Sequence, residues 1–116
     1  MAKGVKTVVY PVKDLAKARD LYARLLGVAP YADEPYYVGF RIGDQDIGLD
    51  PNGHSQGLTG GVPYIEVAGL DGLVAQLVEG GATVQQAAMD VGGGRRIARV
   101  TDADGNVIGL LEDAAS

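Results

Sequence analysis

The sequence predicts an α+β fold in which two βαβββ modules form a single domain over residues 1–116. Two observations predict it. The order strand, helix, three strands occurs twice, on either side of a polar, turn-forming linker at residues 51–57. Equivalent residues in the two halves also recur at fixed offsets, which indicates an internal repeat with modules at approximately 1–57 and 58–116. A chain of 116 residues matches one domain.

The first module begins with a strand at residues 5–12, which is rich in β-branched and aromatic residues. Asp14 is a candidate helix N-cap and Gly27 a candidate helix end. Between them, apolar residues at spacings of three and four define one helical stripe: Leu15, Ala18, Leu21, Tyr22, Leu25 and Leu26. Residues 29–35 are expected to form a connecting loop before strands at 36–42 and 45–50.

The second module repeats this order. A strand is predicted at residues 62–67, and a second apolar stripe starting at Leu70 predicts a helix that ends at Gly80. Three further strands are predicted at the end of the chain, over residues 83–90, 95–101 and 106–112. Turns at Gly92–Gly94 and Asp102–Gly105 separate them.

Two offsets relate the modules. At an offset of 55 residues Val12 matches Val67, whereas at an offset of 61 Gly48 matches Gly109. One helix for three or four strands covers only one face of a sheet, so a second module, a partner chain or a ligand must fill the other face. Two curved half-sheets side by side would form a cup with the helices on its outer face. We therefore expect a cavity for a small molecule.

Composition excludes several classes of function. The chain has 10 basic and 15 acidic residues and a net charge of −5, which argues against a nucleic-acid partner. It contains no cysteine and a single histidine, His54, so thiolate chemistry and a multi-histidine metal site within one chain are excluded. No apolar run is long enough to span a membrane, and residues 1–6 have no signal-peptide core, so we expect a cytoplasmic protein.

Three stretches carry a family resemblance: residues 12–27, with an aspartate–leucine start and a leucine–glycine end; residues 47–51; and the aspartate–glycine–asparagine turn within residues 100–108. In this order they resemble the vicinal oxygen chelate superfamily, which includes glyoxalase I, extradiol dioxygenases, fosfomycin-resistance transferases and bleomycin-resistance proteins. The resemblance implies paired βαβββ modules around a cup, and usually a homodimer.

The resemblance also implies a divalent metal held by one histidine, glutamate or glutamine from each of four strands. The corresponding positions are Thr7, Gly48, Val62 and Gly109. Glycine and valine offer no side-chain donor, and a threonine hydroxyl alone is a poor ligand. We therefore expect no metal site and no cofactor.

Strand alternation extends these four positions to a candidate ligand site, because every second residue of a strand faces the same side. Aromatic residues near the start of the 36–42 strand are candidates for stacking on a planar ligand, or for ordinary strand packing. The predicted ligand-binding residues are Thr7, Val9, Tyr36, Phe40, Gly48, Asp50, Val62, Tyr64, Glu66, Arg96, Gly109 and Leu111.

Few residues are candidates for chemistry. Glu66 is the one catalytic candidate, because an apolar cup would raise the pKa of a carboxyl; the alternative is a rim carboxylate or a partner for Arg96. Asp50 has a similar alternative as a turn residue before Pro51, and His54 is expected in a solvated loop. Arg96 or Arg99 is the candidate contact for an anionic ligand.

Two loop motifs are interpreted as turns. Gly92–Gly94 precedes a strand and no helix, so we interpret it as a flexible hairpin or lid instead of a phosphate loop. Residues 102–106 lack the flanking helices and the later glutamate of a calcium loop, and are interpreted as a hairpin turn.

The sequence thus favours a metal-independent protein that binds or senses a small organic ligand, similar to bleomycin-resistance proteins. The alternative is a glyoxalase-like lyase, isomerase or dioxygenase with unusual metal ligands such as Asp50 and Glu66. Whether the chain is an enzyme is left open by the sequence, with the balance toward a binding protein.

Overall fold

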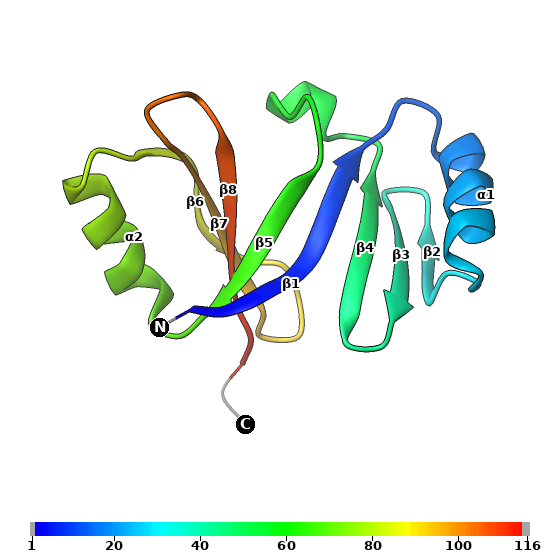
Figure 1. Ribbon diagram of the computed structural model, residues 1–116, viewed down its shortest axis with the longest axis horizontal. Coiled ribbons are helices and arrows are strands. Elements are labelled where there is room, and N and C mark those ends of the chain that lie inside the picture. The colour runs from blue at the N-terminus through cyan, green and yellow to red at the C-terminus, as the bar shows by residue number, and fades with distance from the viewer. Residues whose placement is uncertain (1, 115–116) are drawn as a thin grey trace. The chain divides into compact units, whose positions relative to one another are not determined.

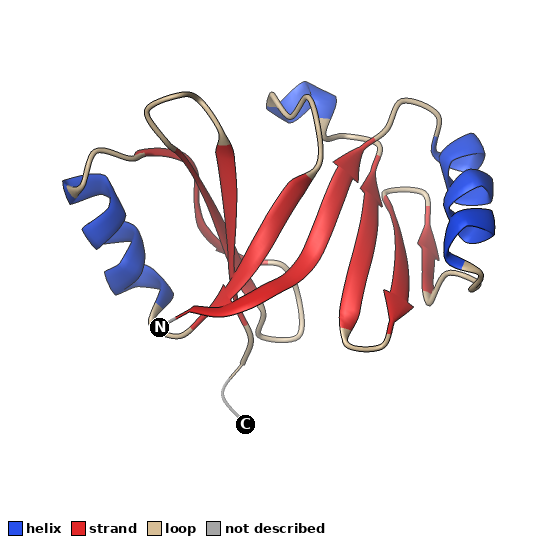
Figure 2. Cartoon of the chain, in the orientation of Figure 1, coloured by secondary structure: helices blue, strands red, loops and turns tan. Residues whose placement is uncertain are grey.

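The computed structural model describes residues 2–114, and in this part of the chain the order strand, helix, three strands occurs twice (Figure 1). The chain divides into two compact units. Of the described residues, 6–62 form the N-terminal unit, and 63–114 together with 2–5 form the C-terminal unit. The predicted α+β class is confirmed: each unit combines a mixed sheet with a single α-helix (Figure 2).

The sheet of the N-terminal unit has the strand order β2-β3-β4-β1. Its first strand pairs in parallel with its last, whereas β2 with β3 and β3 with β4 are antiparallel. A short 3-10 helix, η1, follows the last strand of this unit in the chain, at His54–Gln56. The elements are β1 (Ala2–Pro11), α1 (Leu15–Leu26), β2 (Ala32–Glu34), β3 (Tyr37–Ile42) and β4 (Gln45–Asp50).

The C-terminal unit has the equivalent strand order β5-β8-β7-β6, again with the first strand parallel to the last. No helix within residues 2–114 has the length and apolar character that a membrane crossing requires. The elements are β5 (Val62–Val67), α2 (Leu70–Glu79), β6 (Thr83–Asp90), β7 (Arg96–Thr101) and β8 (Val107–Glu112).

Both predicted ends of α1 are confirmed. The Asp14 side chain accepts a hydrogen bond from the Lys17 backbone N–H at 3.1 Å, which satisfies one of the donors that a helix start leaves unpaired. At the other end Gly27 adopts a left-handed conformation, φ 72°, and its N–H bonds to the Ala23 carbonyl. Four residues of the predicted apolar stripe, Leu15, Ala18, Tyr22 and Leu26, pack on a core of three side chains that are fully buried: Val38, Phe40 and Leu49. Leu21 and Leu25 were assigned to the same stripe but are 64% and 71% exposed, which corrects that part of the prediction.

Residues 29–35 are not entirely loop, which corrects the sequence prediction. The three residues of β2 form an edge strand against β3, with Ala32 opposite Gly39. The segment contains no β-branched residue, so its strand conformation arises from pairing with β3 and not from local propensity. This pairing positions Tyr31, whose N–H donates to the Gly39 carbonyl at 2.9 Å.

The start of α2 is capped by a residue that is remote in sequence. Gly69 precedes the helix and supplies no side-chain cap. Instead, Glu112 Oε2 on β8 accepts hydrogen bonds from the backbone N–H groups of Gly69 at 2.6 Å and Leu70 at 3.3 Å. A carboxylate at this position also interacts favourably with the helix dipole. Glu112 therefore joins α2 to the sheet.

We expect Glu112→Ala to lower the free energy of unfolding by about 1 kcal/mol, because two backbone donors at the start of α2 lose their acceptor. Equilibrium unfolding in urea, followed by circular dichroism, measures this change. Glu79→Ala at the exposed opposite end of α2 is the matched control and should leave the midpoint nearly unchanged. Equal effects of the two substitutions would contradict the capping role of Glu112.

Candidate functional site

Each half-sheet has one face covered by a helix and one face turned away from it. In the N-terminal unit Val38, Phe40 and Leu49 pack toward α1, so strand alternation places Gly39 and Gly48 on the opposite face. In the C-terminal unit Ala98 and Leu110 pack toward α2. We call the two opposite faces the helix-free faces.

Two tyrosine rings lie on adjacent glycines in the N-terminal unit. Gly39 and Gly48 are directly opposite each other in the β3–β4 pairing. A Cβ atom added to Gly48 would lie 2.7 Å from Tyr37 Cζ, and one added to Gly39 would lie 2.9 Å from the Tyr31 ring. Real Cβ atoms do not approach other atoms so closely, so both positions require glycine for the close approach of a ring.

A polar row crosses the same face next to these rings. Arg41 is paired with Asp46, and Asp46 is paired with Thr7, in the β3–β4–β1 register. Arg41 Nε donates to Asp46 Oδ1 at 2.9 Å, and its guanidinium lies over the Tyr31 ring, 4.3 Å from the centroid. The hydrogen bond and the charge of Asp46 raise the pKa of Arg41.

Asp46 and Thr7 are almost completely buried, with 2% and 5% of their surfaces exposed. Asp46 Oδ2 and Thr7 Oγ1 have no hydrogen-bond partner within the described residues. Buried polar atoms of this kind are uncommon in folded proteins, and each is destabilising by about 1–3 kcal/mol when it stays unpaired. This pair marks the helix-free face of the N-terminal unit as a place for polar contacts.

The C-terminal unit has a corresponding arrangement. Tyr64 on β5 is opposite Gly109 on β8, and a Cβ atom added to Gly109 would lie 2.6–2.8 Å from the Tyr64 ring. Tyr64 Oη accepts a hydrogen bond from Arg99 Nη1 at 2.9 Å, and Arg99 Nε donates to Gln85 Oε1 at 2.6 Å. Tyr64 and Arg99 are both buried. Thus a buried, hydrogen-bonded phenol covers Gly109.

Gly48 and Gly109, each covered by a tyrosine ring, occupy equivalent positions in the two units. Val9 pairs with Gly48 between β1 and β4, and Tyr64 pairs with Gly109 between β5 and β8. The offsets of 55 and 61 residues convert the first pair into the second. At each position where the family resemblance places a metal ligand on the last strand of a module, this chain therefore has a glycine under an aromatic ring.

The donor set does not fit the divalent metal that the resemblance implies. Thr7 and Val62 supply at most one hydroxyl, and Gly48 and Gly109 supply no side chain and are covered by phenol rings. Within residues 2–114, no three histidine, cysteine, aspartate or glutamate side chains come together in a way that could hold a metal ion.

With the fold and these faces described, comparison with known proteins identifies the family. Residues 4–110 match the model of the Glyoxalase/Bleomycin resistance protein/Dioxygenase superfamily, so the chain belongs to this superfamily. No curated protein matches the sequence significantly.

Three solved structures illustrate the shared fold. A glyoxalase/bleomycin resistance protein/dioxygenase superfamily member from Vibrio splendidus is 14% identical with a TM-score of 0.73, covering 98% of this chain and 100% of its own. Methylmalonyl-CoA epimerase from Mycobacterium tuberculosis is 21% identical with a TM-score of 0.71, covering 98% and 90%. The Mn(II)-bound glyoxalase from Novosphingobium aromaticivorans is 20% identical with a TM-score of 0.73; 98% of this chain matches 40% of that one.

Strand alternation places nine predicted ligand-binding residues on the helix-free faces. On β1 and β4 these are Thr7, Val9, Gly48 and Asp50, and on β5 and β8 they are Val62, Tyr64, Glu66, Gly109 and Leu111. Val62 is buried, with 2% of its surface exposed. The other predicted residues have different surroundings.

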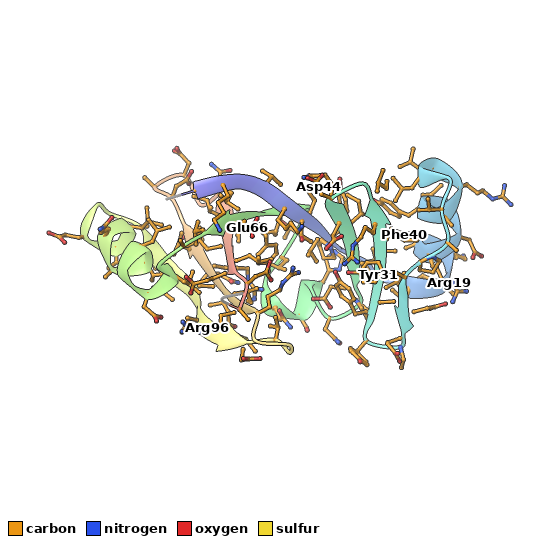
Figure 3. The ribbon with its side chains drawn as sticks, turned by 90° about the horizontal axis from the view of Figure 1, so that it is seen from below. Arg19, Tyr31, Phe40, Asp44, Glu66 and Arg96 are labelled. Carbon is orange, nitrogen blue, oxygen red and sulfur yellow. The ribbon has the colours of Figure 1, made fainter. Side chains whose placement is uncertain are left out.

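The two aromatic candidates from the predicted 36–42 strand, Phe40 and Tyr36, have other surroundings. Phe40 is fully buried and packs on the side of β3 toward α1 (Figure 3). Tyr36 precedes β3 and is 64% exposed. Instead, the rings on the helix-free face of the N-terminal unit are those of Tyr37 and Tyr31. Strand alternation through the buried Val38 is the sequence signal that distinguishes Tyr37 from Phe40.

Arg96 lies on the helix-covered face of β7 and pairs with α2. Its Nη1 and Nη2 donate to the two carboxylate oxygens of Asp71 at 3.0 and 2.9 Å, and Glu112 lies 4.0 Å away. These hydrogen bonds from Arg96 lower the pKa of Asp71, so their contribution to stability is present above the ordinary carboxyl pKa and is lost as the pH falls below it. Glu66 is not among these partners.

On the helix-free face of the C-terminal unit, the predicted alternative Arg99 is the arginine that the structure places near Gly109. Its sequence signal is a charged residue between two apolar residues that face the core, Ala98 and Val100, both fully buried. A charge at this position of a strand points to the opposite face, where burial requires polar partners. Gln85 and Tyr64 are such partners.

Turn roles account for the remaining polar candidates. Asp50 Oδ1 accepts from the Asn52 backbone N–H at 2.8 Å, which is the turn role considered for it. Asp102 Oδ1 accepts from the backbone N–H groups of Asp104 and Asn106, and hydrogen bonds from Asn106 lower the pKa of Asp102. His54 lies exposed in η1.

Proposed function

We propose that this chain is a metal-independent member of its superfamily that binds a small organic molecule on the helix-free faces. The observation that carries this proposal is the tyrosine ring over each of the two glycines, Gly48 and Gly109, where the resemblance places metal ligands. A ring in van der Waals contact with the strand occupies the space that a ligand side chain would need.

The groups on these faces are suited to binding by contact. Tyr37 and Tyr31 offer aromatic surface, and Arg41 and Asp46 offer fixed polar groups beside it. Sites for small organic molecules combine apolar and aromatic surface with a few convergent polar groups. The proposal therefore needs no Lewis acid and no covalent step, only stacking and hydrogen bonding.

A thermal-shift comparison of the full chain, with and without prior treatment with a chelator, tests the proposal. The panel contains planar aromatic compounds and glutathione–aldehyde adducts, each measured with and without added Mn²⁺, Ni²⁺ or Zn²⁺. We expect at least one compound to stabilise the metal-free protein, by about 2.7 kcal/mol at 100 times its dissociation constant, and added metal to change nothing.

Two results would contradict the proposal. One is a stoichiometric divalent metal that is retained through purification and is needed for ligand binding. The other is turnover of a panel compound that Glu66→Gln abolishes without changing the affinity, because this result would assign acid–base chemistry to Glu66.

A further inference from the structure

We infer that the exposed side of α1 is an interface between two copies of this chain, in which the two helices pack antiparallel about a two-fold axis. This surface, which we call the outer face of α1, goes beyond the proposed function and does not depend on it, because no residue of the helix-free faces takes part. Its members are the exposed residues Lys17, Asp20, Leu21, Arg24, Leu25 and Val28.

Two leucines give the outer face an apolar surface that packing within the chain does not use. Other apolar residues of α1 already contact the core beneath the helix. Leu21 and Leu25, by contrast, are 64% and 71% exposed, and residues four positions apart on a helix are neighbours on its surface. Val28, just beyond the helix end, continues this surface with 36% of its own exposed. Adjacent exposed apolar side chains rimmed by charges are typical of a protein contact.

The charges on the outer face are complementary to those of a second copy. Asp20 and Arg24 lie one turn apart on the same flank of the leucine pair. In an antiparallel pair centred between Leu21 and Leu25, each leucine lies opposite the other leucine of the second copy. The same arrangement brings Asp20 of each copy opposite Arg24 of the other. A two-fold axis makes every contact twice, as in an isologous dimer.

Both charges are available for this contact. The Asp20 side chain is 74% exposed and lies 3.7 Å from Arg19 Nε, while Arg19 Nη1 is also directed toward Asp33 at 3.4 Å. No ion pair within residues 2–114 includes Arg24, so Asp20 and Arg24 do not pair with each other inside one helix. Exposed ion pairs contribute little affinity, but they fix the register of an interface.

The charge balance favours a second copy of the chain over an anionic membrane as the occupant. Lys17 and Arg24 would be attracted to anionic lipids, but Asp20 shares their face and the chain has a net charge of −5. Contact with a second copy uses both signs of charge. One helix pair is a small interface, so we expect a weak dimer with a dissociation constant on the order of micromolar or higher.

Sedimentation velocity of the full chain over an about hundredfold range of concentration tests the inference. We expect a reversible equilibrium between monomer and dimer. Leu21→Ala removes apolar contact and retains helix propensity, and it should weaken the dimer about tenfold because the substitution occurs twice in the interface. Val78→Ala removes a residue of α2 that is 44% exposed, and as the matched control it should leave dimerisation unchanged.

Charge reversal in two separate chains tests the antiparallel geometry. Asp20→Arg and Arg24→Asp each place like charges opposite one another in a homodimer, so each variant alone should dimerise less than the unmodified chain. An equal mixture of the two variants should form a heterodimer, because every charge pair across the interface is then opposite in sign. Both variants keep a net negative charge, so general attraction between them does not explain the effect.

The inference is overturned if the unmodified chain stays monomeric at every concentration, if Leu21→Ala dimerises as tightly as Val78→Ala, or if mixing the folded charge variants restores no dimer. If a charge variant does not fold by circular dichroism, the comparison of Leu21→Ala with Val78→Ala decides the question. Monomers that cosediment with phosphatidylserine vesicles through Leu21 would also overturn it. Failure here leaves the proposed function intact, because ligand binding on the helix-free faces is measured separately by thermal shift.

Discussion

Phe40→Ala is expected to lower the free energy of unfolding by about 3–5 kcal/mol, the largest effect of any single substitution proposed for this chain. Phe40 has no exposed surface and packs with Val38 and Leu49 beneath α1. Removal of the ring loses the free energy gained by transferring it from water to the core. It also leaves a cavity that the surrounding strand and helix fill only in part. A domain of this size has a total stability of about 5–15 kcal/mol, so the variant should unfold at much lower denaturant.

Urea unfolding followed by circular dichroism measures this effect against two controls. Phe40→Leu keeps most of the apolar volume and should have a much smaller effect than Phe40→Ala. Tyr36→Ala removes a ring that is 64% exposed and should change stability by no more than about 0.5 kcal/mol. An effect of Phe40→Ala as small as that of Tyr36→Ala would show that Phe40 is not a core residue.

The contrast between these two aromatic residues shows how far the sequence predicts the site. Both were candidates for ligand contact because they occur in one aromatic stretch. The fold separates them, since β3 begins at Tyr37 and alternation then assigns Phe40 to the core and Tyr37 to the helix-free face. Composition identified the aromatic cluster, but the position where the strand begins decides which ring faces which side.

Local signals predicted the elements that depend on local chemistry. The Asp14 cap, the Gly27 helix end and most of the apolar stripe of α1 involve residues within a few positions of one another, and the structure confirms them; Leu21 and Leu25 of the stripe are exposed instead. The repeat predicts a third strand after α1, but its location at β2 was not predicted, and neither was the Glu112 cap of α2. Each depends on a partner that the fold supplies, Gly39 for β2 and the backbone of Gly69 for Glu112.

The same distinction applies to the candidate site. The glycines at positions 48 and 109 were predicted as places without metal ligands, and they are in fact contact surfaces for rings. A glycine in a strand often marks the close approach of another group, but the sequence does not say which group approaches. Tyr37 lies on the strand that forms a hairpin with the strand of Gly48. Tyr64, by contrast, is 45 positions from Gly109 in the sequence, and only the pairing of β5 with β8 brings these two residues together.

The second large effect is expected at this contact. Gly109→Ala should lower the free energy of unfolding by about 1–3 kcal/mol, because the new methyl group would lie 2.6–2.8 Å from ring atoms of Tyr64. Tyr64 is buried and hydrogen-bonded to Arg99, so its ring cannot move aside freely. Gly109 is not among the glycines with positive φ, so alanine tolerates its backbone and the clash alone causes the loss.

A double-mutant cycle with Tyr64→Ala isolates that cause. Once the ring is removed, Gly109→Ala should become nearly neutral or slightly stabilising, since alanine restricts the unfolded chain more than glycine does. Gly72→Ala, within α2 with open space around its Cβ position, is the control for the intrinsic effect and should stabilise the protein by about 1 kcal/mol. An equal loss from Gly109→Ala with and without the Tyr64 ring would mean that the phenol does not hold this position, and the tyrosine-over-glycine basis of the proposed function would fail with it.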